Sequence, residues 1–357
     1  MRSVNLEIKD IAFGGKGVAR DEGKAIFIPF TIESERITAQ IVREKKQFAE
    51  AELTEILEPS ADRVTPRCPY FGRCGGCSYQ HISYPHQLAT KAHQVEQAMR
   101  RIGRLAEPPM QPMIPSPREY EYRNRITVHA QDNVVGFYRR DIHELMDIER
   151  CPIAAPEVNE SLAQLRTGRV RDGHYTLRAH SGPRVFAQTN DAVADALAGL
   201  IANLLSSGGE LLIDAFCGAG FFSKRLRPEF KRVVGIDWDR FAIAAAQENA
   251  APNERYISGD VTTELRWLLE ASDSTSTTLI VDPPATGLTP EIRGAILDSP
   301  PRTMIYVSCN PPTLARDIAE LQRHFSVVSI TPFDMFPQTA EIEVVAHLRA
   351  VASASCR

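Results

Sequence analysis

From Gly209 onward the sequence alternates short apolar runs with stretches of helical pattern. The first run leads through Phe216 into a turn with two glycines, and the second run ends at Asp237. Short apolar runs bounded by turn residues are typical of buried strands. Strands that alternate with helices form a doubly wound parallel sheet. We therefore expect an α/β fold in the second half of the chain.

The turns that follow these strands carry residues that suit a ligand. The glycines of Cys217-Gly218-Ala219-Gly220 let the backbone approach a ligand at the start of a helix. Asp237 follows about 20 residues later, a placement that serves to hold ribose hydroxyls. Asp260 and the turn Asp282-Pro283-Pro284 end the next two strands. This combination fits S-adenosylmethionine better than a nicotinamide cofactor, although each acid could instead cap a helix.

A cysteine follows a further apolar run, Thr303 to Val307. Ligands of open α/β sheets bind beyond the carboxyl ends of the strands, and a thiol is a strong nucleophile. Cys309 is therefore a candidate nucleophile; the alternative is a small buried hydrophobe. Glu343 lies in a later apolar run, where burial would raise the pKa of its carboxyl and suit it to proton transfer. The alternative is a buried glutamate with a structural role.

The first half of the chain divides into two parts. Residues 1–58 contain short strands between glycine and polar turns, which predicts a small β-barrel that binds oligonucleotides or serves as a structural appendage. A linker with proline and small polar residues follows at 58–62. Residues 59–185 form a central domain with an amphipathic helix at 87–100 and paired strands at 122–129 and 134–138.

Four cysteines of the central domain have metal-ligand spacing. Cys68, Cys74 and Cys77 lie close together with glycines between them, and Cys151, followed by proline, supplies a fourth thiolate. The cysteine and proline pair is typical of the last ligand of many iron–sulfur sites, but four thiolates also suit structural zinc. We therefore expect a bound metal.

Composition narrows the class of protein. The 357 residues are 43% hydrophobic and 24% charged, which is ordinary for a soluble chain of two or three domains. No apolar run approaches the roughly 20 residues of a membrane span, and the first residues lack a signal-peptide core, so we expect a cytoplasmic protein. The net charge of -4 disfavours binding of nucleic acid by bulk electrostatics but allows a local basic face.

These motifs together resemble the RNA uracil-5-methyltransferase family, in the branch with a TRAM domain and a [4Fe-4S] cluster. Gly15 to Arg20 is similar to the TRAM pattern, and Phe186 to Asn190 is similar to the entry of the catalytic domain. The resemblance implies a TRAM barrel with an OB-like fold at 1–58, an α+β iron–sulfur domain at 59–185, and a Rossmann-like class I methyltransferase domain at 186–357.

The resemblance also implies the chemistry. Cys309 would add to C6 of uracil, C5 would take the methyl group of S-adenosylmethionine, and Glu343 would remove the C5 proton. RNA would be the partner, with 23S rRNA favoured over tRNA, and the chain is expected to be a monomer. The cluster ligands would be the four cysteines named above. The implied donor-binding residues are Gln188, Asp214, Phe216, Gly218, Gly220, Asp237, Asp260 and Asp282.

Two positions depart from the family pattern. Ala285 stands where the family usually has arginine after Asp-Pro-Pro, which puts the anchoring of that loop in doubt. Glu341 replaces a histidine two residues before Glu343, and repulsion between two carboxylates should raise at least one pKa. We expect lower activity or a shifted pH optimum.

Two alternatives remain open. A decayed catalytic domain would leave an RNA-binding or folding factor. A methyltransferase acting on cytosine would use the same thiol addition, but it usually needs an acid in a different motif, which this sequence does not have.

Overall fold

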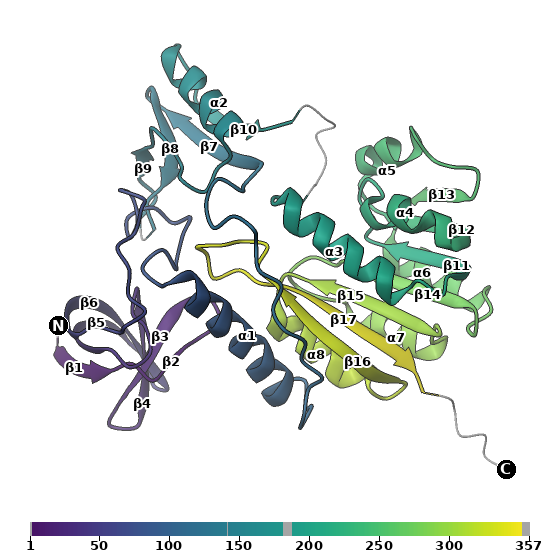
Figure 1. Ribbon diagram of the computed structural model, residues 1–357, viewed down its shortest axis with the longest axis horizontal. Coiled ribbons are helices and arrows are strands. Elements are labelled where there is room, and N and C mark those ends of the chain that lie inside the picture. The colour runs from purple at the N-terminus through teal and green to yellow at the C-terminus, as the bar shows by residue number, and fades with distance from the viewer. Residues whose placement is uncertain (1, 141, 181–187, 352–357) are drawn as a thin grey trace. The chain divides into compact units, whose positions relative to one another are not determined.

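A computed structural model describes residues 2–140, 142–180 and 188–351 (Figure 1). The chain divides into two compact units. The first unit comprises residues 1–94, 116–181 and 336–341, and the second comprises 95–115, 182–335 and 342–357. Within the described ranges, every helix is too short or too polar to cross a lipid bilayer. The predicted boundary between 185 and 186 lies outside the described residues.

The first unit begins with the predicted β domain. Its six strands form one sheet in the order β1-β5-β6-β4-β3-β2 around a core of alternate aliphatic residues. The Lys9 N–H donates to the Val18 carbonyl at 2.8 Å, so the segment after β1 also bonds to β3 and the sheet curls. The strands are β1 Ser3–Glu7, β2 Asp10–Ile11, β3 Lys16–Asp21, β4 Lys24–Pro29, β5 Arg36–Glu44 and β6 Phe48–Glu58.

The rest of the first unit contains an antiparallel sheet of four strands in the order β10-β7-β8-β9. The expected pair of strands is confirmed, since His129 lies opposite Gly136 in the β7 and β8 ladder. The amphipathic helix predicted at 87–100 is α1, Tyr84–Arg101, whose last residues belong to the second unit. The other elements are β7 Arg125–Gln131, β8 Val134–Tyr138, β9 Leu145–Asp147, α2 Pro156–Thr167 and β10 Gly173–Arg178.

The second unit is a sheet of seven strands in the order β13-β12-β11-β14-β15-β17-β16. The first five strands are parallel, as predicted, whereas β17 is antiparallel to both of its neighbours. The strands are β11 Gly209–Ala215, β12 Phe230–Asp237, β13 Glu254–Ser258, β14 Thr277–Val281, β15 Thr303–Ser308, β16 Phe325–Phe333 and β17 Glu343–Ala350.

Helices cover both faces of this sheet (Figure 1). On one face, apolar residues of α6, α7 and α8 pack against alternate residues of the strands to form the main core. On the other face, Ile243 and Ala246 of α5 pack against Cys217 and Tyr256. The helices are α3 Asp191–Leu204, α4 Phe221–Leu226, a 3₁₀ turn Arg227–Glu229, α5 Arg240–Gln247, α6 Val261–Glu270, α7 Pro290–Asp298 and α8 Pro311–Leu321.

The strand order reverses at β11, which has β12 on one side and β14 on the other. Ligands of doubly wound sheets bind at the carboxyl ends of strands beside such a reversal. We therefore expect a ligand-binding site beyond Ala215, next to the turns that follow β12 and β14.

Candidate functional site

The turn after β11 has the backbone freedom that the sequence predicts. Phe216, Gly218 and Gly220 all have positive φ values, of 66°, 54° and 82°. A Cβ atom on Gly220 would lie 2.7 Å from the Tyr256 hydroxyl oxygen, whereas no atom lies within 4 Å of a Cβ atom built on Gly218. Gly218 therefore borders open space at the end of the sheet, where a ligand can approach the backbone.

Asp237 links this turn to the next one. One of its carboxylate oxygens accepts the Gly218 N–H at 2.8 Å and the other accepts the Asp239 N–H at 2.9 Å. The carboxylate is thus fixed beside the open space at Gly218. This arrangement fits a donor whose ribose would reach the remaining lone pairs of Asp237.

Two other predicted donor-binding acids have structural partners. Asp214 is fully buried, and one of its oxygens accepts the N–H and the hydroxyl of Ser223. Burial raises the pKa of Asp214 to about 6. Asp260 caps α6 by accepting the Thr263 N–H at 2.8 Å, and this bonding lowers its pKa. Helix capping, the alternative considered for these acids, is therefore what the structure assigns to Asp260.

Asp282 follows β14, and its N–H donates to the Ala215 carbonyl at 3.3 Å. Burial, together with the Asp214 carboxyl, raises the pKa of Asp282 well above the ordinary value. Gln188, the first described residue after the 181–187 gap, is partly buried. Phe186 and Ala187, at the predicted entry of the domain, lie outside the described residues. The binding roles of Asp282 and Gln188 stay predictions.

Cys309 follows β15 directly and is partly exposed. The Ser308 hydroxyl accepts the Asn310 N–H at 3.1 Å, and the Asn310 side chain accepts the Thr313 N–H to cap α8. Cys309 is thus held between the end of a buried strand and a capped helix. A turn of this kind fixes the backbone that carries the thiol.

Glu343 begins β17 and is 4% exposed. Ser308 of β15 is paired with Val344 of β17, the last pair of this antiparallel ladder. Cys309 follows Ser308 in the turn after β15, and Glu343 precedes Val344 at the start of β17. That the Cys309 and Glu343 side chains face one another stays a prediction.

Asp317 of α8 anchors the loop that contains Ala285. The fully buried Asp317 carboxylate accepts hydrogen bonds from the Tyr306 hydroxyl at 2.7 Å and the Leu288 N–H at 2.8 Å, and it pairs with Arg293 at 3.0 Å. The Thr313 hydroxyl also donates to the Ala285 carbonyl at 3.1 Å. The loop is therefore held without an arginine at position 285. Glu341 is exposed, and its expected effect on activity stays a prediction.

The sequence reasoning missed two aromatic side chains near Asp237. Trp238 is 75% exposed and Phe241, in the first turn of α5, is 66% exposed. Large apolar side chains with this exposure commonly mark a binding surface. The available signal was an aromatic residue directly after the acid that ends β12.

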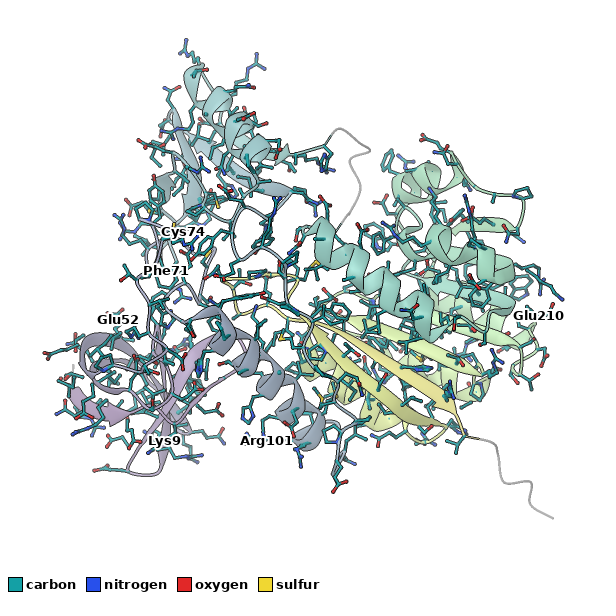
Figure 2. All side chains as sticks on the ribbon, viewed as in Figure 1. Lys9, Glu52, Phe71, Cys74, Arg101 and Glu210 are labelled. Carbon is teal, nitrogen blue, oxygen red and sulfur yellow. The ribbon has the colours of Figure 1, made fainter. Side chains whose placement is uncertain are left out.

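The predicted metal site is not confirmed. No group of three or more His, Cys, Asp or Glu side chains in the described ranges has an arrangement that could hold a metal ion. Burial, together with the nearby Cys151, Cys74 and Cys68 thiols, raises the pKa of the Cys77 thiol to about 12. Burial likewise raises the pKa of Cys151 to about 11. In Figure 2, Phe71 and Cys74 are labelled on the loop that carries three of these residues.

One segment at each end of the chain matches a known family. Residues 2–54 match the TRAM domain, and residues 268–351 match the family tRNA (Uracil-5-)-methyltransferase. Relatives include RNA methyltransferases, named as uncharacterized, of Aquifex aeolicus (strain VF5) and Protochlamydia amoebophila (strain UWE25). The first is 28% identical over 97% of this chain and 98% of the relative, and the second is 29% identical over 98% of both.

Over nearly its whole length this chain is similar to proteins named as RNA methyltransferases. Its fold is similar to that of the tRNA (uracil-54, C5)-methyltransferase of Pyrococcus abyssi, solved with S-adenosyl-L-homocysteine. The TM-score is 0.73 at 24% identity, covering 97% of this chain and 100% of that one. The predicted class I methyltransferase fold with a TRAM-like β domain at its amino end is therefore confirmed, whereas the iron–sulfur domain is not.

Proposed function

We propose that this chain is an RNA methyltransferase that transfers the methyl group of S-adenosylmethionine to C5 of uridine. The observation that carries the proposal is the antiparallel pair of Ser308 and Val344, because Cys309 directly follows the first residue and Glu343 directly precedes the second. The match of residues 268–351 supports it, because that segment contains both residues.

The chemistry follows from the two side chains. The Cys309 thiolate adds to C6 of the ring, and the electron pair of the C5–C6 bond moves to form an enolate with a nucleophilic C5. The donor, when bound, supplies an electrophilic methyl group, which C5 takes. Glu343 then accepts the C5 proton, the C6–S bond breaks, and the Cys309 thiolate is restored. Gly218 and Asp237 would hold the donor at the turns after β11 and β12. The target base has to leave its stack to reach the thiol.

RNA that contains 5-fluorouracil tests the covalent step, because fluorine at C5 cannot be removed as a proton. The wild-type protein should form an adduct with such RNA that survives a denaturing gel, and Cys309→Ala should form none. Ser274→Ala is the control, since Ser274 is exposed before β14 and should not affect the adduct. An adduct in Cys309→Ala would overturn the assignment, and no wild-type adduct with any RNA would favour an RNA-binding factor.

The proposal leaves two classes of RNA substrate to be distinguished, 23S rRNA and tRNA. The sequence resemblance favours 23S rRNA, whereas the matching family is described by tRNA. Mass spectrometry of both RNAs from a deletion strain separates the two: loss of 5-methyluridine from 23S rRNA supports the first, and loss from tRNA supports the second.

We also propose that the four cysteines hold a [4Fe-4S] cluster with a structural role, and no catalytic step uses it. Support comes from the sequence alone, in which Cys68, Cys74, Cys77 and Cys151 have metal-ligand spacing. Iron and acid-labile sulfide analysis of protein purified without oxygen tests this point. If the analysis finds stoichiometric zinc and no sulfide, the four cysteines form a structural zinc site and the cluster proposal is wrong.

A further inference from the structure

Among the described elements, α2 packs on one face of the antiparallel sheet of the first unit. Ile126, Val128 and Ala130 alternate along β7 and pack with Val158 and Leu162 of α2. Figure 1 shows α2 lying alongside β7, β8 and β10. Because successive side chains of a strand point to opposite faces, the residues between these positions project from the other face.

That second face carries matching residues on neighbouring strands. The register pairs His129 with His174 and Thr127 with Thr176, and the two threonine hydroxyl oxygens lie 3.3 Å apart. Thr127, His174 and Thr176 are exposed, and His129 is partly exposed. These side chains form one continuous surface across β7 and β10.

Four rings form a ladder across this face. The ring centroids of His174 and His129 are 4.6 Å apart, and those of His129 and Tyr138 are 4.4 Å apart. Tyr138 and His143 stack at 4.1 Å with their planes inclined by only 19°. We name His174, His129, Tyr138 and His143 the ring ladder. Flat rings on an open sheet face can stack with bases of a single nucleic-acid strand.

Positive charge adjoins the ring ladder. Arg125 of β7 is paired in register with Arg178 of β10 on the same face. Burial, with the nearby Arg178 and Arg123 guanidinium groups, lowers the pKa of Arg125, so several cations gather at this end of the sheet. On this face β7 and β10 present arginine, threonine, histidine and glutamine but no carboxylate. A phosphate backbone is the complementary partner for such a surface.

We propose that the ring ladder and the arginine pair bind a single-stranded segment of the RNA substrate. Bases stack on His129 and Tyr138, and the backbone passes toward Arg125 and Arg178. This inference rests on the proposed function, because it names a surface of the first unit that would hold part of the RNA substrate. A strand is favoured over a duplex, since the bases of a duplex are already stacked and cannot reach the rings.

Binding of a fluorescein-labelled RNA oligonucleotide of about 16 nucleotides, measured by polarisation, tests the inference. His129→Ala and Tyr138→Ala should each weaken binding about tenfold, because stacking contributes strongly per base. Tyr138→Phe keeps the ring and should bind as the wild type does. Gln164→Ala is the matched control, since Gln164 is exposed on α2, and it should leave the affinity unchanged. Wild-type affinity in both alanine variants would overturn the proposal.

Photocrosslinking covers the case in which an alanine variant fails to fold. Wild-type protein is irradiated with an oligonucleotide that contains 4-thiouridine, and the crosslinked peptides are identified by mass spectrometry. Crosslinks to peptides that contain His129, Tyr138 or His174 support the proposal, and crosslinks confined to other segments overturn it. Neither assay needs turnover, so failure to trap Cys309 would reject the proposed chemistry without deciding this inference.

Discussion

Cys309 directly follows Ser308 of β15 and Glu343 directly precedes Val344 of β17, and Ser308 and Val344 are paired in the antiparallel ladder. Glu343 is buried at the start of its strand, and Cys309 is partly exposed beside a capped helix. A nucleophile that a ligand can reach and a base shielded from bulk water suit successive steps on one substrate ring. This relationship predicts different consequences for the loss of each group.

Glu343→Gln should stop the reaction after methyl transfer. The thiol of Cys309 is intact, so the adduct forms, but the amide cannot accept the C5 proton. Turnover should fall about 10²-fold to 10⁴-fold, the usual contribution of a general base. A protein–RNA adduct should then accumulate on ordinary uridine RNA, visible on a denaturing gel. Glu270→Gln, at an exposed position of α6, is the control; equal turnover in the two variants would remove Glu343 from the mechanism.

The Asp317 network should make a large contribution to stability. Asp317→Ala leaves Arg293 and the Tyr306 hydroxyl without their buried acceptor, and loss of one partner of a buried pair costs about 3–5 kcal/mol. Glu320→Ala removes the other partner of Arg293, but Glu320 is 39% exposed, so the cost should be at most about 1 kcal/mol. Urea unfolding measures both values. Similar costs for the two variants would show that Asp317 does not anchor the loop.

The sequence predicted the strands of the second unit because most of them are short apolar runs that are followed by turn residues. It could not predict the direction of β17, since an apolar run reads the same in a parallel and an antiparallel strand. The antiparallel direction of β17 pairs Val344, which follows Glu343, with Ser308, which precedes Cys309. The sequence pattern identified Cys309 and Glu343 as candidates, whereas the positions of these two residues depend on how β15 and β17 pair.

The loop after Asp282 shows a second limit of sequence reasoning. The departure at Ala285 raised doubt about its anchoring, and the anchor proved to be Asp317, more than thirty positions away. Nothing local to the Asp-Pro-Pro turn marks that acid. Asp260 shows the converse, because an acid at the end of a strand serves equally as a helix cap or a ligand group. Contacts of this kind depend on packing between helices that are distant in sequence.

Trp238 should report donor binding. The chain has two tryptophans, Trp238 beside the Asp237 turn and Trp267 on α6. A Trp267→Phe variant keeps Trp238 as the single indole, and its fluorescence should change on titration with S-adenosylhomocysteine. In the Trp238→Phe variant, the remaining Trp267 should not respond. A response from Trp267 alone would place the donor away from the turn after β12.

Asp214 should give the second unit a distinct pH dependence of stability. Burial raises the pKa of Asp214 from 3.8 to about 6, so the folded state holds a proton over a range in which the unfolded state has lost it. Stability therefore falls as the pH rises from about 4 to about 6, by about 3 kcal/mol in total. Asp214→Asn can still accept from Ser223 and should lose the part of this decrease that Asp214 contributes, whereas the part from Asp282, whose pKa burial also raises, remains. Asp273→Asn is a control in which the pKa shift has the opposite sign. Hydrogen bonds from Thr275 lower the pKa of Asp273, so its carboxylate stabilises the folded state at pH values above its ordinary pKa. Urea unfolding of the three proteins from pH 4 to pH 7 measures the difference. An identical pH dependence in the wild type and Asp214→Asn would mean that Asp214 is ionised inside the fold.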